Sequence, residues 1–101
     1  MFEQLVLVAI LRLGDEAYAI PLREEIERRT GRSIARGALY TALERLETKQ
    51  FVTSRMSEPR AERGGRSRRY YAVTPAGLEA IKAARHSLLQ LWQGLEGTLE
   101  R

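Results

Sequence analysis

The last part of the chain, residues 75–101, carries a helical pattern that is too long for the rest of so short a chain to cover. Thr74 followed by Pro75 is a typical helix start, because threonine caps a helix and proline fits its first position. A continuous helix over this range would extend about 40 Å. The pattern favours a helix that joins two copies of the chain, and an amphipathic helix folded back on its own domain is the alternative. The seam, spaced alternately by three and four as in a coiled coil, is Leu78, Ile81, Arg85, Leu88, Trp92, Leu95 and Leu99.

A second apolar surface is expected at the start of the chain, where residues 2–13 fit a helix. Its other side is also apolar, through Leu7, Val8 and Leu11. A helix that is apolar nearly all round needs cover on two sides. We therefore expect Leu7 and Leu11 to contact a second subunit, unless the domain itself buries the whole helix. The core stripe is Phe2, Leu5, Val6, Ala9, Ile10 and Leu13.

The amino-acid composition argues against several classes of function. A chain of 101 residues, with 44% hydrophobic and 30% charged residues, fits one soluble globular domain. Because cysteine is absent and His86 is the only histidine, we expect no disulfide, no metal site, no cofactor and no enzyme activity. The longest apolar run, Leu5 to Leu11, is too short to span a membrane, and no secretory signal precedes it. We expect a cytoplasmic protein without a membrane partner.

A small enzyme that uses paired carboxylates is one competing hypothesis. Its candidate residues are Glu24, Glu25 and Glu27, the densest acidic cluster of the chain. Arginines are interleaved with them on the outward side of a predicted helix, so we interpret the cluster as a solvated charged face. His86, alone on the last helix, is interpreted as a surface or seam residue.

The middle of the chain predicts two further helices and a hairpin. After a break at 14–16, a helix over 18–30 accommodates Pro21 in its first turn and ends at Gly31. The next helix begins at Ala35 or Arg36 and runs to about Lys49. Residues 51–56 and 68–73 are rich in β-forming residues and enclose the turn region 57–67. The residues expected to face inward from the helix over 18–30 are Ile20, Leu22 and Ile26.

The predicted helix over 36–49 has two different faces. Its apolar face consists of Ala38, Leu39, Ala42, Leu43 and Leu46. The opposite face consists of Arg36, Gly37, Tyr40, Thr41, Glu44 and Thr48. The apolar face seats the helix on the domain, which leaves the other face available for a partner.

Four stretches of the sequence resemble the PadR family of bacterial transcriptional regulators over roughly residues 3–85. They are AYAIPLREEIERRTG, GALYTALERLE, RGGRSRRYY and VTPAGLEAI. The resemblance implies a mainly α (α+β) winged helix-turn-helix, with a DNA-binding domain over 1–74 and a dimerisation helix over 75–101 in a single compact unit. The chain departs from the family at Ala35, where a serine commonly caps the third helix, and at Gln50, where a small residue is usual.

The resemblance makes the third helix the recognition helix, whose polar face enters the major groove of DNA. Arg36 is expected to read a guanine, because its planar fork matches two guanine acceptors. Tyr40 and Thr41 are expected to hold phosphates, Glu44 to reach a base or phosphate, and Gly37 to allow close approach.

The arginines concentrate where the wing would meet DNA. Between Arg55 and Arg69 there are six arginines and two glutamates, an excess equal to the net charge of +4 of the whole chain. Arg28, Arg29 and Arg32 add phosphate contacts or complement the end of their helix. The wing residues expected to contact DNA are Arg60, Arg63, Arg66 and Arg68.

The resemblance implies a sequence-specific regulator of transcription, and more specifically a repressor. It is expected to bind double-stranded DNA as a homodimer, at an operator that is an inverted repeat. Trp92 is a candidate contact for a small aromatic effector at the subunit interface, with packing of the dimer core as the alternative. A winged-helix module that binds protein without binding DNA is the competing class.

Overall fold

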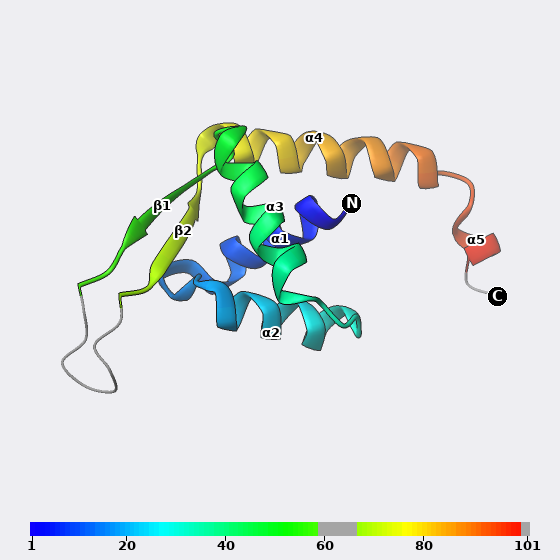
Figure 1. The fold of residues 1–101 in the computed structure, drawn as a ribbon. Helices are drawn as coiled ribbons and strands as arrows, with labels where there is room; N and C mark the ends of the chain where they lie inside the picture. The colour runs from blue at the N-terminus through cyan, green and yellow to red at the C-terminus, as the bar shows by residue number, and fades with distance from the viewer. Residues whose placement is uncertain (59–66, 100–101) are drawn as a thin grey trace.

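The order of helices and strands agrees with the sequence expectation of a mainly α fold with one hairpin (Figure 1). The computed structural model describes residues 1–58 and 67–99. The strands form one antiparallel sheet. In chain order the elements are α1 (Phe2–Leu13), the 3-10 turn η1 (Gly14–Glu16), α2 (Ala19–Thr30), α3 (Arg36–Thr48), β1 (Val52–Met56), β2 (Arg69–Val73), α4 (Pro75–Trp92) and α5 (Glu96–Leu99).

Helix α1 lies at the centre of the fold, where it packs against α2, α3, α4 and β2. Because neighbours surround it, its buried surface is wider than a single stripe. Leu7, which we expected to face a second subunit, is 3% exposed and belongs to the core of its own chain. Val8 and Leu11 remain exposed on α1. The apolar face of α1 available to a partner is therefore narrower than its sequence suggests.

Helices α2 and α3 form the helix-turn-helix. Leu22 and Ile26 of α2 are buried, as predicted, but Ile20 is 59% exposed. Ile20 and Leu22 are two positions apart, which places them on nearly opposite sides of a helix. On α3 the apolar face is buried except for Ala38 at its edge, which is exposed. The buried residues of α3 are Leu39, Ala42, Leu43 and Leu46.

The hairpin is attached to the body through Val52 at the start of β1 and Tyr71 in the middle of β2, whose side chains are both buried. Strand β1 pairs with β2 in a register that places Val52 opposite Val73 and Met56 opposite Arg69. The Tyr71 N–H donates to the Ala17 carbonyl oxygen at 2.9 Å, which ties β2 to the segment before α2. Burial of the Tyr71 side chain raises the pKa of its phenol. Arg60, Arg63 and Arg66 lie outside the described residues.

The junction between the hairpin and α4 has the predicted cap. Thr74 Oγ1 accepts a hydrogen bond from the Gly77 N–H at 3.0 Å and donates to the Gln50 carbonyl oxygen at 2.7 Å. Gln50 adopts φ of 66°, a left-handed conformation in which glycine is less costly. Gln50, the unusual residue before β1, therefore has a backbone conformation that glycine would adopt more easily.

Helix α4 ends at Trp92, so the helix that we expected over 75–101 is wrong in its length. The backbone leaves the helix at Gln93, whose ψ is 123°, and the short α5 begins at Glu96. Between them, Gly94 has φ of 90°. Glycine adopts this conformation without a steric cost, whereas other residues rarely do. Leu95 and Leu99 therefore lie beyond the end of α4, and the predicted seam is continuous only from Leu78 to Trp92.

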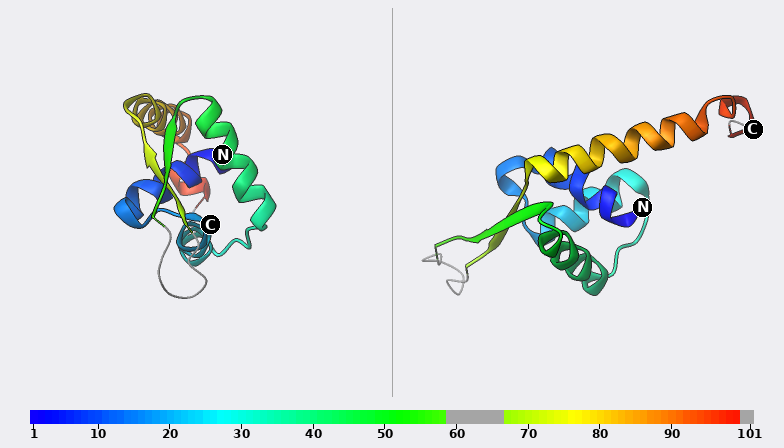
Figure 2. Two further views of the ribbon diagram at one scale, coloured as in Figure 1. Left: turned by 60° about the vertical axis from the view of Figure 1, so that its left-hand side comes forward. Right: turned by 90° about the horizontal axis from the view of Figure 1, so that it is seen from above.

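The second half of α4 extends past the helical body, away from the hairpin (Figures 1 and 2). The molecule is elongated, with extents of 55 × 28 × 21 Å. Among the described helices, none is long and apolar enough to cross a membrane. Large apolar side chains are exposed along the protruding part of the chain: Leu88, Leu89, Leu91, Trp92 and Leu95.

Candidate nucleic-acid interface

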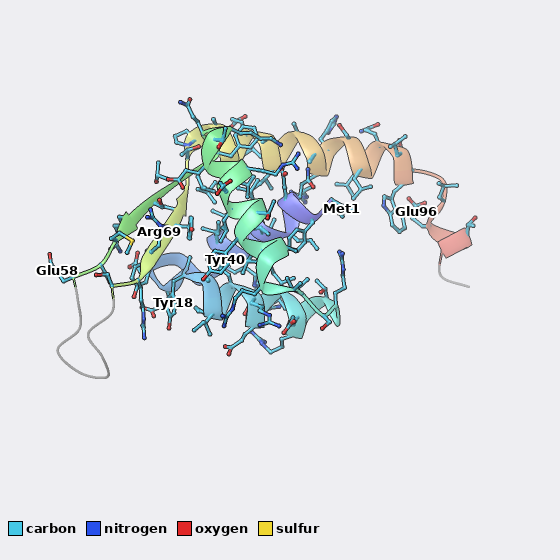
Figure 3. The ribbon with its side chains drawn as sticks, in the orientation of Figure 1. Met1, Tyr18, Tyr40, Glu58, Arg69 and Glu96 are labelled. Carbon is cyan, nitrogen blue, oxygen red and sulfur yellow. The ribbon has the colours of Figure 1, made fainter. Side chains whose placement is uncertain are left out.

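The polar face of α3 is exposed along its length. Arg36 and Tyr40 lie one turn apart on this face. Tyr40, labelled in Figure 3, is 50% exposed. The opposite face of the helix is buried. The fold thus brings the expected recognition residues together on one accessible surface, and they are Arg36, Gly37, Tyr40, Thr41 and Glu44.

Gly37, in the first turn of α3, has free space where a side chain would lie. A Cβ atom placed on Gly37 would meet no heavy atom within 4 Å among its described surroundings. Packing therefore does not require glycine at this position, although glycine is unfavourable within a helix. A partner that approaches the backbone closely gives a reason for its presence.

The turn before α3 is held by polar contacts with α2. Gly31 ends α2 in a left-handed conformation, with φ of 71°. Ala35 is the N-cap of α3, and none of the described side chains caps this helix. The Ile34 N–H instead donates to Glu27 Oε2 at 2.7 Å, and the Ile34 carbonyl oxygen accepts from Arg23 Nε at 2.7 Å. Sequence reasoning missed this arrangement, because the spacing of charges does not show which backbone groups they reach.

The other end of α3 is tied to α1 and to the hairpin. Glu3 of α1 pairs with Lys49 at 2.8 Å and with Arg45 at 3.3 Å, and the Lys49 hydrogen bond lowers the pKa of the Glu3 carboxyl. Glu47 Oε2 accepts from Ser54 Oγ of β1 at 2.7 Å. The helix is therefore fixed at both ends relative to the body.

A stack of arginines and tyrosines joins the turn-side end of the hairpin to the start of α2. The Arg68 guanidinium lies 4.4 Å from the ring centre of Tyr18, and Tyr18 contacts Tyr70 edge-on with ring centres 5.4 Å apart. Arg55 lies 4.9 Å from the ring centre of Tyr70. Figure 3 shows Tyr18 near this end of the hairpin. Arg68, which we expected at the DNA, thus also has a partner within its own chain.

Sequence reasoning placed Tyr70 in the hairpin but did not identify its contacts with Tyr18 and with the arginines. The signal available was the run Arg68-Arg69-Tyr70-Tyr71, in which arginine adjoins aromatic residues that can accept cation–π contacts. Tyr18 lies far from this run in sequence, so only the fold reveals their contact. The Arg69 guanidinium of β2 donates to Ser54 Oγ of β1 at 2.9 Å.

Glu25 is a buried structural acid, which corrects our interpretation of an outward charged face. It is 7% exposed and pairs with Arg12 of α1 at 3.1 Å and with Arg28 and Arg29 of its own helix. The Arg29 hydrogen bond is the main reason why the pKa of the Glu25 carboxyl is lowered. Arg28 and Arg29 therefore have a carboxylate partner, while Arg32 is exposed.

The three acids of α2 do not form paired carboxylates. Glu24 is exposed, Glu25 faces arginines, and Glu27 faces the Ile34 N–H. His86 is exposed on α4. The arrangement thus serves the fold, and the alternative of an enzyme with two cooperating carboxylates has no support in this part of the chain.

Of the residues expected at a subunit interface, some are exposed and others are buried in the core of their own chain. Leu7 is buried, and Ile81 is partly buried against the core of its own chain. Trp92 is 38% exposed at the end of α4. Arg85 lies exposed within the same seam. Exposed members of the expected interface are Leu11, Leu78, Leu88, Trp92 and Leu95.

Solved structures share this fold. A transcriptional regulator from Clostridium thermocellum superposes with a TM-score of 0.78 and 23% identity, over 94% of this chain and 86% of that one. A PadR family transcription regulator from hypervirulent Clostridium difficile superposes with a TM-score of 0.74 and 23% identity, over 98% of this chain and 99% of that one. A PadR family transcriptional regulator from Eggerthella lenta is 26% identical, with a TM-score of 0.71, over 96% of this chain and 82% of that one.

Sequence comparison gives the family. The chain is 37% identical over 89 residues to an uncharacterised 37.1 kDa protein in a transposon of Streptomyces fradiae. The match covers 88% of this chain but 23% of the relative, so the chain spans about a quarter of that protein's length. The family model described as the transcriptional regulator PadR-like family matches residues 6–83. Because this match includes the helix-turn-helix, the hairpin and the start of α4, the chain belongs to the PadR-like family of transcriptional regulators.

Proposed function

We propose that the chain is a DNA-binding regulator of transcription that reads sequence in the major groove with α3. The main observation behind the proposal is that the apolar face of this helix is buried while its polar face is exposed. Both ends of α3 are also tied to neighbouring elements, which suits a surface that must present side chains in fixed positions.

The residues of the exposed face take different roles in this proposal. Arg36 reads a base, because a bidentate arginine distinguishes guanine from other bases. Tyr40 and Thr41 bind phosphates, and Glu44 reaches a base or a phosphate from the next turn. Gly37 lets the DNA backbone approach α3, which is supported by the open space around this residue.

The hairpin acts as the wing in the proposal and contributes phosphate contacts. Arg60, Arg63 and Arg66 are assigned to this role from the sequence alone, since they lie outside the described residues. Arg68 contributes through a side chain that its stack with Tyr18 holds in place. Phosphate contacts of this kind raise affinity for all sequences and weaken as salt rises.

We propose that two copies of the chain form a homodimer on an inverted-repeat operator. The exposed apolar residues Leu11, Leu88 and Trp92 support this proposal, since a second copy would cover them. Residues 1–74 then read DNA, and residues 75–101 join the copies as part of the same compact unit. A two-fold dimer presents its recognition helices about 34 Å apart, which corresponds to one turn of DNA.

The proposed regulator is a repressor that responds to a small aromatic compound. Trp92 is the proposed contact, because an exposed indole offers a flat apolar surface. An effector bound there acts by changing the separation of the two recognition helices. Trp92→Leu should abolish the response to an active compound while DNA binding persists. A response that the Trp92→Leu variant retains would contradict the role of Trp92.

Binding to random duplex DNA at increasing salt tests the proposed function against a protein-binding winged helix. A DNA-binding regulator should bind in dilute buffer, and its affinity should fall steeply with salt, because phosphate contacts release counterions. Selection from a random pool should then yield an inverted repeat. A chain that does not bind duplex DNA in dilute buffer would instead support the protein-binding module.

A further inference from the structure

The start of α3 depends on contacts from α2. Ala35 lies at the N-cap position, and no side chain of the described residues caps the helix there. Arg36, the proposed base reader, is the first residue of α3. An uncapped first turn tends to fray, because its N–H groups have no partner within the helix. The segment immediately before Arg36 must therefore fix its position.

Ile34, in this segment, is held in place by three sets of contacts. Its N–H donates to Glu27 Oε2 and its carbonyl oxygen accepts from Arg23 Nε, each at 2.7 Å. Its side chain is buried in the core. A residue held through both backbone groups and its side chain cannot rotate without breaking one of these contacts. The direction in which the chain enters α3 is thus set just before Arg36.

The two side chains that hold Ile34 form a unit on α2. Arg23 and Glu27 lie one helical turn apart and pair at 3.6 Å, and α2 is anchored by buried Leu22 and Ile26. The side chains of Arg23 and Glu27 are 41% and 32% exposed. A pair this exposed contributes little to the stability of the whole fold. Its contacts with the Ile34 backbone point to local positioning.

We propose that Glu27, supported by Arg23, is a positioning residue that sets the sequence discrimination of α3. The proposal rests on the DNA-reading function proposed above. A base contact through two hydrogen bonds requires correct distance and angle, so a small displacement of Arg36 weakens it. Phosphate contacts spread over the wing tolerate the same displacement, because they depend mainly on charge. Loss of Glu27 should therefore reduce discrimination more than general affinity.

The ratio of affinities for the selected operator and for a scrambled duplex, at one salt concentration, measures this discrimination. Glu27→Ala should lower the ratio about fivefold, as expected for the loss of one hydrogen bond. Glu24→Ala is the matched control, because Glu24 is an exposed acid on the same helix and the substitution changes the net charge equally. The control should leave the ratio unchanged, and equal ratios in the two variants would overturn the proposal.

Glu27→Gln separates positioning from charge. The glutamine side chain keeps an oxygen that can accept from the Ile34 N–H but loses the negative charge. If Glu27 acts by positioning, this variant should recover most of the lost ratio. A ratio as low as that of Glu27→Ala would contradict the role of the hydrogen bond.

Amide hydrogen exchange in the DNA-free protein tests the positioning separately from the proposed function. The amides of Ile34 and of the first turn of α3 should exchange faster in Glu27→Ala than in Glu24→Ala. Unchanged exchange would overturn the positioning role even if the wild-type chain binds DNA. Absence of DNA binding by the wild type would refute the proposed function alone. If Glu27→Ala does not fold, Arg23→Ala replaces it, because it removes the contact to the Ile34 carbonyl oxygen.

Discussion

At the residue scale, Gly77 is the position where the fold has no room for a side chain. A Cβ atom there would lie 2.1 Å from the Phe51 carbonyl oxygen and 2.9 Å from Val73 Cγ1. The Phe51 oxygen also accepts a hydrogen bond from the Thr74 N–H at 3.0 Å, so moving it would disturb the junction between hairpin and α4. Glycine at this position allows the close approach of α4 to the segment before β1.

Gly77→Ala should therefore lower the free energy of unfolding by about 2 to 3 kcal/mol, because the backbone must shift to admit the methyl group. Gly37→Ala is the matched control, since it places the same methyl group in the first turn of α3, where nothing lies within 4 Å. The control should raise the free energy of unfolding by about 0.5 to 1 kcal/mol. Urea denaturation measures both values, and equal effects would contradict the packing argument.

The buried carboxyl of Glu25 predicts a pH dependence of stability. Its folded-state pKa is lowered from 4.5, chiefly by the Arg29 hydrogen bond. The stabilisation is therefore fully present above pH 4.5 and is lost as the pH falls through the lowered folded-state pKa. Glu25→Gln should reduce the free energy of unfolding at neutral pH and flatten its decline in acid. Urea denaturation across this range tests the sign, with Glu24→Gln as the exposed control that should retain the wild-type profile.

At the element scale, the hairpin is held to the body by the stack of Arg55, Tyr70, Tyr18 and Arg68. Tyr18→Leu removes the ring that contacts both Tyr70 and Arg68, and should lower the free energy of unfolding by about 1 to 2 kcal/mol. Tyr18→Phe keeps the ring and should remain close to wild type. Urea denaturation distinguishes the two variants, and a similar loss in both would show that the hydroxyl, not the stack, matters.

The bounds of most elements follow from the sequence because they depend on local pattern. The apolar spacing of α1 and α3, Gly31 after α2 and the Thr74–Pro75 start of α4 all agree with the structure. The end of α4 does not, because an apolar seam continues past Gly94 while the backbone leaves the helix at Gln93. A pattern of side chains predicts which face is apolar but not where the backbone turns.

The candidate site was predictable where exposure follows from periodicity, as for Arg36 and Tyr40 on α3. It was not predictable where burial depends on elements distant in sequence. Leu7 is covered because α1 lies at the centre of the fold, and Glu25 is buried because Arg12 of α1 reaches it. A single sequence contains no signal for such contacts between helices.

At the scale of the whole molecule, the protruding α4 predicts association of two chains. Leu88→Arg places a charge on the exposed apolar seam and should shift the protein toward monomer at micromolar concentration, because burying an unpaired charge is costly. His86→Arg is the control, since His86 is exposed on α4 but lies outside the seam. Sedimentation velocity measures both, and a wild-type chain that is monomeric in this range would contradict the proposed dimer.

The central claim is that the exposed face of α3 reads DNA sequence, and selection of bound fragments by wild type and by Arg36→Ala tests it most directly. The two selected sites should agree except at one base position in each half-site, where Arg36→Ala should relax the preference by about 1 to 3 kcal/mol. Binding to random duplex should change little by comparison. An unchanged preference at every position would contradict the assignment of Arg36, and a wild-type chain that selects no sequence would contradict the claim itself.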